Sequence, residues 1–363
     1  MGLNFKTYMP TSTSYKGGKS KDEVSVSGKK IYKMSSNENP LGASPRAMAA
    51  LKKHLSSISE YPPPMDYRFR AKLSEYYNGV LSPDQFVTTN SGVANIDLII
   101  RGFLDANSEC IYCSPYFSAY AGFPKKVGAK AINVPLVGEK FDLDIRGIEN
   151  AITEKTSLLF ITSPNNPTGS YIPKSQVDEL LSILPEHVLL VFDEVYYQYA
   201  DAEDYVRALP YVLEHKNVIA INSFSKAYGL AGMRIGYSYA SEEVATYLQK
   251  LRIPFMLNTL SMEAAIGAMQ DNEFIEQTVA LIHKEKKFLY QELDAIGMEY
   301  WKTQANFIMM RPQMTPVQFE ARMIEEGIMV RPLPGFGAPD CVRVTIGAHE
   351  ANEAFINALK KIS

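Results

Sequence analysis

Cysteine is scarce in this sequence, with three residues among 363. Three cysteines cannot build a disulfide framework. Cys110 and Cys113 have the C-x-x-C spacing, but no second pair of cysteines or histidines follows to complete a zinc site. We therefore interpret them as buried thiols near the end of a strand. The sequence predicts no metal site and indicates the reducing cytoplasm as the location.

An excess of basic residues is also missing. Lysine and arginine number 37 against 40 aspartates and glutamates, a formal net charge of -3, which excludes the basic footprint of a nucleic-acid-binding protein. No apolar run is long enough for a membrane span, and the first residues lack the apolar core of a signal peptide. Lys6 occupies the position where a myristoylation motif requires serine or threonine. We expect neither nucleic acid nor a membrane as a partner.

What is present is an ordinary globular composition, with 46% hydrophobic and 21% charged residues. A chain of this length is long enough for one large domain and a smaller one. A helix-rich pattern replaces the strand runs from about residue 245. The sequence predicts an N-terminal arm (1–30), the first part of a small domain (31–60), a large domain (61–252) and the C-terminal part of the small domain (253–363).

Short apolar runs in the large domain predict buried strands at 158–161, 188–192 and 218–221. The first two are joined by a helix with Val177 and Leu180 on one face. Apolar strands alternating with helices are typical of a parallel, doubly wound sheet. We predict an α/β protein with a mainly parallel sheet of this kind and a smaller α+β domain.

Each of these runs ends in polar residues. Asn166 lies in the sequence SPNNPTG after the first strand, Asp193 and Tyr196 in DEVY after the second, and Lys226 after the third. Ligands of doubly wound sheets bind beyond the carboxyl ends of the strands. These residues are therefore expected to meet at one site.

The loop from 222 to 236, NSFSKAYGLAGMRIG, holds Lys226 among small residues. A desolvated lysine can act as an amine nucleophile toward a carbonyl. Ser223 and Arg234 could together hold a phosphate, the serine by hydrogen bonds and the arginine as a planar fork. A further phosphate seat is predicted where a strand at 86–89 turns into a helix at Gly92 and Val93, because a helix N-terminus exposes backbone N–H groups. A lysine beside a phosphate clamp indicates pyridoxal 5′-phosphate.

Four ordered motifs, NENPLG, SPNNPTG, DEVY and SFSK with an arginine eight residues after the lysine, resemble those of the fold-type I aminotransferases that use pyridoxal phosphate. Within these the chain is most similar to the histidinol-phosphate aminotransferase group, from about Tyr15 to the C-terminus. The resemblance implies the type I fold of pyridoxal-phosphate transferases, the cofactor itself and a homodimer. Tyr61 matches a tyrosine that family members donate to the partner's active site.

The resemblance also assigns roles around the cofactor. Lys226 would bond to its aldehyde and then carry a proton between the substrate Cα and C4′ of the cofactor. Asp193 would keep the ring nitrogen protonated, with Asn166 and Tyr196 at the ring oxygen O3′. Phe117 would pack against the face of the cofactor ring, with the neighbouring Tyr116 as the alternative. The cofactor phosphate would be held by Ser223, Arg234, Gly92 and Val93.

Three further residues match substrate-binding positions of the group. Arg343 would bind an α-carboxylate, Arg331 a substrate phosphate, and Tyr15 would cover the substrate, with Asn166 nearby. The implied reaction moves an amino group between an L-amino acid or an amino-alcohol phosphate, histidinol phosphate first, and a 2-oxo acid such as 2-oxoglutarate, within histidine biosynthesis. The alternatives are an aromatic amino acid aminotransferase, a decarboxylase of the threonine-phosphate type, and a protein that binds the cofactor without catalysis.

Overall fold

The computed structural model describes residues 3–9, 18–24, 26, 28–215 and 217–362. The strands are β1 (Tyr32–Lys33), β2 (Phe86–Thr89), β3 (Glu109–Tyr112), β4 (Lys130–Asn133), β5 (Thr156–Thr162), β6 (Leu189–Asp193), β7 (Val218–Ser223), β8 (Gly236–Ala240), β9 (Glu299–Tyr300), β10 (Phe307–Arg311), β11 (Ile328–Met329), β12 (Arg331–Pro332) and β13 (Val342–Thr345). The helices are α1 (Pro45–His54), α2 (Tyr67–Tyr76), α3 (Gly92–Phe103), α4 (Ala119–Gly122), α5 (Ile145–Ala151), α6 (Lys174–Ile183), α7 (Leu209–Glu214), α8 (Glu242–Lys250), α9 (Thr259–Met269), α10 (Asn272–Ile296), α11 (Pro316–Glu325) and α12 (His349–Ile362).

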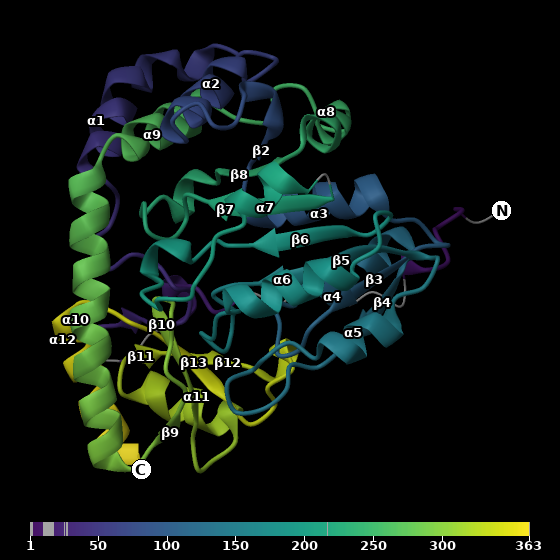
Figure 1. Cartoon of the computed structure of the whole chain (residues 1–363). Coiled ribbons are helices and arrows are strands. Elements are labelled where there is room, and N and C mark those ends of the chain that lie inside the picture. The colour runs from purple at the N-terminus through teal and green to yellow at the C-terminus, as the bar shows by residue number, and fades with distance from the viewer. Residues whose placement is uncertain (1–2, 10–17, 25, 27, 216, 363) are drawn as a thin grey trace.

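The large sheet has seven strands in the order β2-β8-β7-β6-β5-β3-β4 (Figure 1). From β7 to β4 every pairing is parallel, whereas β8 runs antiparallel to both of its neighbours. The three strands predicted from apolar runs are β5, β6 and β7 at the centre of this sheet. The prediction of a mainly parallel, doubly wound sheet is confirmed, while β8 and its reversal of direction were not predicted.

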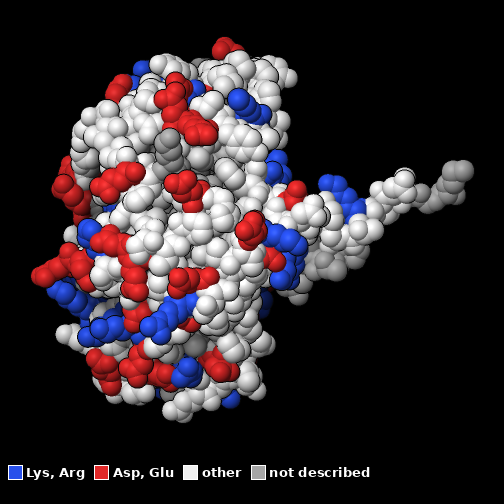
Figure 2. Space-filling view, turned by 45° about the vertical axis from the view of Figure 1, so that its right-hand side comes forward, with Lys and Arg blue, Asp and Glu red and all other residues white. Residues whose placement is uncertain are grey.

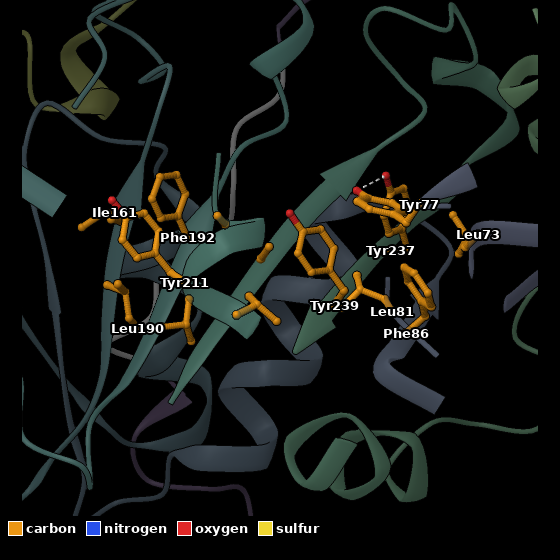
Figure 3. Packing of buried hydrophobic residues seen from close by; sticks show 14 of the residues in the cluster. Leu73, Tyr77, Leu81, Phe86, Ile161, Leu190, Phe192, Tyr211, Tyr237 and Tyr239 are labelled. Carbon is orange, nitrogen blue, oxygen red and sulfur yellow. Dashed lines mark hydrogen bonds between the residues drawn. The ribbon is translucent and has the colours of Figure 1, made fainter. Parts of the chain in front are cut away.

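Alternate residues of the central strands enter two different cores. Leu190 and Phe192 of β6 pack with α5, α6 and α7, whereas Leu189 and Val191 pack with α3, α4 and α8. Figure 3 shows part of the first core, including Tyr237 and Tyr239 from β8. Burial on both faces explains why these strands are continuous apolar runs without polar alternation.

A second, smaller sheet has the order β12-β13-β10-β9 and lies at the lower end of the molecule in Figure 1, with α11 and α12 beside it. The long helix α10 runs along the left edge and connects the two ends. Residues 31–60 are shared between these ends. β1 pairs with β11 of the small region, whereas α1 packs on α9 and Ala47 joins the core of the large sheet. The division of the chain at residues 60 and 252 stays a prediction.

The surface in Figure 2 mixes acidic and basic side chains over the whole visible face. Near the N-terminus, Leu3 and Phe5 are exposed. Within the described part of the chain, no helix is long and apolar enough to cross a membrane. All three cysteines are free and buried, as was expected of Cys110 and Cys113, and burial raises the pKa of these two to about 12.

Parallel pairing in register aligns the strand ends that carry the polar residues. Thr162 of β5 lies opposite Asp193 of β6, and Asp193 lies opposite Ile221 of β7. The chain therefore leaves three adjacent strands at the same edge, and the segments that follow form one side of a cavity.

Candidate active site

The cavity has a volume of about 440 Å³ and lies between this edge of the large sheet and the small sheet. The predicted residues that line it are Gly92, Val93, Phe117, Asn166, Asp193, Tyr196, Ser223, Lys226, Arg234, Arg331 and Arg343. Tyr61 is absent from the lining and is 87% exposed elsewhere on the surface. Tyr15 lies outside the described residues. The structure thus brings together side chains that lie up to 251 residues apart in sequence, from Gly92 to Arg343.

Asp193 ends β6 and is 6% exposed. Its Oδ2 accepts a hydrogen bond of 2.6 Å from the hydroxyl of Tyr120, and its Oδ1 accepts one of 3.1 Å from the N–H of Val195. Burial raises the pKa of Asp193 to about 6, against these two hydrogen bonds, which lower it. A buried carboxylate held by neutral donors at the wall of a cavity suits a ligand that brings its own positive charge.

Lys226 follows β7 in a turn and is partly buried. Its Nζ donates to the carbonyl oxygen of Ser36 at 3.0 Å and lies 5.7 Å from the centre of the Tyr196 ring. Burial, followed by the positive charge of Arg343, lowers the pKa of Lys226 to about 7. Near neutral pH a large fraction of this amine is therefore unprotonated and nucleophilic.

One end of the cavity is suited to an anion. Helix α3 begins there with Ser91 as its N-cap, whose hydroxyl accepts from Ala94 N–H, so the N–H groups of Gly92 and Val93 stand at the first turn. A Cβ on Gly236 would lie 2.6 Å from the Gly92 nitrogen, so only glycine permits this close approach of β8.

Ser223 and Arg234 complete this end of the cavity. Arg234 is exposed, donates from Nη1 to the carbonyl oxygen of Ala231 at 2.7 Å, and has a left-handed backbone with φ of 50°. Such a conformation is uncommon for a residue other than glycine and tends to occur at functional sites. The predicted phosphate clamp is therefore assembled in space, although its ligand role stays a prediction.

The opposite wall presents two arginines on neighbouring strands. Arg331 of β12 and Arg343 of β13 are direct partners in the antiparallel register. Both guanidinium groups lie over the ring of Phe336, at 5.2 and 5.7 Å from its centre. Arg343 is buried and donates to the side-chain oxygen of Asn166 and, at 2.9 Å, to the carbonyl oxygen of Ser35.

Between these walls lie the aromatic residues. The hydroxyl of Tyr196 accepts from Asn37 Nδ2 at 3.0 Å. Phe117 lines the cavity and packs edge-on against Tyr120 with ring centres 5.8 Å apart. Tyr116 is absent from the lining, so the structure supports Phe117 over its neighbour for the ring-stacking position.

Among the parts of this site that the sequence did not reveal are Tyr120, Phe336 and the segment 35–37, whose last residue is the first of the NENPLG motif. In the same motif Asn39 donates to the carbonyl oxygen of Ala227 at 2.8 Å, which ties the motif to the lysine loop. The two asparagines of this motif were the signal in the sequence, but short polar side chains in a loop give no indication of which distant group they contact.

The doubly wound sheet and this cavity together define a class of enzyme, one that binds a phosphorylated aldehyde through a lysine and an anion seat. The aminotransferase class I and II family matches residues 29–362, and the chain belongs to it. It is an aminotransferase acting on amino and oxo acids, and pyridoxal 5′-phosphate is its cofactor. This confirms the resemblance stated from the motifs.

Individual relatives cover nearly the whole chain. A histidinol-phosphate aminotransferase 2 of Carboxydothermus hydrogenoformans is 34% identical over 362 residues, 99% of this chain and 97% of that protein. The histidinol-phosphate aminotransferase of Akkermansia muciniphila is 36% identical over 340 residues, 94% of this chain and 92% of that protein. The crystal structure of histidinol-phosphate aminotransferase from Sinorhizobium meliloti in complex with pyridoxal-5′-phosphate has a TM-score of 0.83 at 22% identity, covering 93% of each chain. This last likeness supports the fold.

The residues fit the cofactor on three independent grounds. The cavity holds a lysine with a pKa near 7, a buried carboxylate whose direct hydrogen-bond partners are neutral, and a helix N-terminus with an arginine beside it. These are the groups that an aldehyde, a basic ring nitrogen and a phosphate require.

Proposed function

We propose that this aminotransferase acts on histidinol phosphate and 2-oxoglutarate. The observation that carries the proposal is the side-by-side pair Arg331 and Arg343 facing one cavity. A phosphate ester carries close to two negative charges at pH 7, and two guanidinium groups match it better than one. The relatives named for histidinol phosphate, at 34% and 36% identity, support the same substrate.

The chain's own residues would act as follows. The bound cofactor supplies an aldehyde that exchanges amines and a ring that withdraws electrons from the substrate Cα. Lys226 would bond to the aldehyde carbon through its unprotonated amine, with the aldehyde oxygen leaving as water, and once released it would move a proton at Nζ. Asp193 holds a proton on the ring nitrogen, because its buried carboxylate is otherwise uncompensated. Asn166 and Tyr196 hold the ring oxygen, and Phe117 covers the ring face.

The anion contacts divide between the two ends of the cavity. Gly92, Val93, Ser223 and Arg234 would bind the cofactor phosphate at the start of α3. At the other end the arginine pair would bind the substrate, either the carboxylates of the amino donor or the phosphate of histidinol phosphate. Alternation between these two substrates at one site is what a transaminase needs.

Substitution of Arg331 tests the substrate assignment. We expect Arg331→Ala to lower kcat/KM for histidinol phosphate by about 10- to 100-fold, the cost of one charged hydrogen-bonding contact, and to affect phenylalanine much less. Arg311→Ala is the matched control, because Arg311 is an exposed arginine of the small sheet that pairs with Glu299. Equal losses of kcat/KM on both substrates would contradict the proposal that Arg331 binds the substrate phosphate.

The same assays distinguish the alternatives. A higher kcat/KM for aromatic amino acids than for histidinol phosphate would favour the aromatic aminotransferase. Release of CO2 from phosphothreonine, without formation of the aminated cofactor, would favour the decarboxylase.

We also propose a homodimer in which Tyr61 reaches the partner's cavity. Tyr61 packs against Phe255 with the rings tilted and their centres 5.3 Å apart, and nearby segments of the chain carry further exposed apolar side chains. These are Leu55, Ile58, Met65, Tyr67 and Ile253. A concentration of exposed apolar side chains in the segments 55–67 and 253–255 supports an interface there. The three buried free thiols further support a reducing cytoplasm as the place where the dimer works.

Mixed dimers test this arrangement. Tyr61→Ala and Lys226→Ala are each expected to impair activity, and mixing the two variants under exchanging conditions should restore part of it, since one composite site in the mixed dimer is intact. A monomer in analytical ultracentrifugation at micromolar concentration would contradict the proposal.

A further inference from the structure

The segment 35–37, which follows β1, passes through the cavity wall and contacts the predicted site residues one after another. The carbonyl oxygen of Ser35 accepts from Arg343 Nη2 at 2.9 Å. The carbonyl oxygen of Ser36 accepts from Lys226 Nζ at 3.0 Å. These two contacts use backbone atoms, so they depend on the path of the chain and not on the side chains at 35 and 36.

The third contact is made by a side chain. Asn37 Nδ2 donates to the hydroxyl of Tyr196 at 3.0 Å. Asn37 is 1% exposed and has a left-handed backbone with φ of 55°. An asparagine buried in this conformation is held by its surroundings, since the left-handed region is otherwise unfavourable for a residue with a side chain.

Three hydrogen bonds hold Asn37 in place. Its N–H donates to Thr345 Oγ1 at 2.8 Å, and its Oδ1 accepts from the same hydroxyl at 3.2 Å. Its carbonyl oxygen accepts from Asn306 Nδ2 at 3.1 Å. Because Thr345 engages the oxygen of the carboxamide, the nitrogen is directed at Tyr196.

We propose that Asn37 is a positioning residue that fixes the direction of the Tyr196 hydroxyl proton. A phenol oxygen that accepts from Asn37 gives its own proton to a different acceptor, and Tyr196 lines the cavity. The proposal rests on the proposed function, in which that acceptor is the ring oxygen of the cofactor. Asn37 itself lines the cavity, and the role proposed for it is exerted through Tyr196.

The consequence concerns charge on the cofactor. A phenol proton donated to the ring oxygen stabilises negative charge there and weakens the hold of that oxygen on a neighbouring proton. If Tyr196 turns away, the ring oxygen holds the proton on the neighbouring Lys226 nitrogen more tightly. The pH at which the bound cofactor changes its visible absorbance then rises. The charged groups that act on Lys226 are Arg343, Glu38, Arg234 and Lys33, and Asp193 lines the same cavity. The variants below leave all of them in place.

The experiment follows the visible absorbance of the holoenzyme, loaded with pyridoxal 5′-phosphate, as a function of pH. Asn37→Ala and Asn37→Gly both remove the carboxamide, but glycine adopts the left-handed backbone without strain. We expect both variants to raise the midpoint of the absorbance change by about one pH unit, the size of one neutral hydrogen bond. A wild-type midpoint in Asn37→Gly would show that only backbone strain matters and would overturn the proposal.

A second pair of variants separates this proposal from the proposed function. Tyr196→Phe alone should raise the midpoint at least as far as Asn37→Gly, and the double variant should show no further rise. If Tyr196→Phe shifts the midpoint and Asn37→Gly adds its full shift on top, Asn37 does not act through Tyr196. If Tyr196→Phe itself changes nothing, the role of Tyr196 in the proposed function fails.

Discussion

Two adjacent carboxylates at the end of β6 face opposite sides of the large sheet. Asp193 lines the cavity, whereas Glu194 is completely buried in the core. Burial raises the pKa of Asp193 to about 6. Burial is also the largest influence on Glu194 and raises its pKa, but the positive charge of Arg207 and the hydrogen bonds from Arg207, Ala208 and Asn222 together outweigh it. The pKa of Glu194 therefore lies below its usual range.

The difference lies in their partners. Glu194 accepts from Arg207 Nη2 at 2.9 Å, from the Ala208 N–H at 2.8 Å, from Asn222 Nδ2 at 2.9 Å and from the hydroxyl of Tyr239 at 2.7 Å. The carboxylate of Asp193 accepts one hydrogen bond from a hydroxyl and one from a backbone N–H. The protein compensates the core charge within its own structure and leaves the cavity charge to be compensated by a ligand. A buried carboxylate is therefore a candidate for function when its internal partners are too few.

The largest effect is expected on the cavity side. Lys226→Ala removes both the nucleophile and the group that moves the proton, so we expect transaminase activity to fall about 10⁴-fold. The free energy of unfolding without cofactor should not fall, because the lysine is held in a site that disfavours its charge. Steady-state kinetics and urea denaturation measure the two quantities. Lowered stability together with retained activity would mean that Lys226 serves stability and not catalysis, which would contradict the comparison.

On the core side, Glu194→Gln should act on stability. It leaves the Arg207 guanidinium without its anion, and we expect a loss of about 3 kcal/mol in the free energy of unfolding, the lower end for a broken buried pair because Arg207 is 30% exposed. The stability that Glu194 contributes is present at pH 7 and is lost as the pH falls through its lowered pKa. Urea denaturation at pH 7 measures the loss. An unchanged free energy of unfolding would mean that the Arg207 guanidinium does not depend on Glu194 for its compensation.

In the protein without cofactor, Asp193→Asn should increase the free energy of unfolding, whereas Glu194→Gln decreases it. The pKa of Asp193 rises from 3.8 to about 6, so folding binds a proton and the stability it confers is lost as the pH increases from about 4 to 6. Removing this charge should increase the free energy of unfolding at pH 7 by about 2 to 3 kcal/mol. Saturating pyridoxal phosphate should cancel the gain, because the variant loses the partner of the ring nitrogen. A destabilised apoprotein would contradict the comparison.

The smallest effect concerns pH. The rate at which the apoprotein takes up pyridoxal phosphate should rise with pH and level off above about 7, because the unprotonated Lys226 amine reacts. Arg343→Gln removes a positive charge that lowers this pKa, so it should move the midpoint to higher pH. Stopped-flow absorbance measures the rate, and an unchanged midpoint in Arg343→Gln would exclude that influence.

Sequence patterns predicted much of this site because its residues follow apolar strands. The runs that became β5, β6 and β7 lead directly into Asn166, Asp193 and Lys226, so the parallel register alone brings these three together. Tyr120 and Asn37 come from segments without such a pattern. Their contacts with Asp193 and Tyr196 join residues 73 and 159 positions apart. Nothing local in the sequence specifies such pairs.

By itself, the sequence determined the doubly wound sheet, the family and many of the residues that line the cavity, because strand periodicity and ordered motifs are local properties of the chain. Only the tertiary structure decided which of the two adjacent carboxylates pairs with an arginine, that Phe117 and not Tyr116 lines the cavity, and that the segment 35–37 contacts the site residues. The physical reason is that desolvation and hydrogen bonding depend on neighbours in space, and those neighbours come from distant parts of the chain.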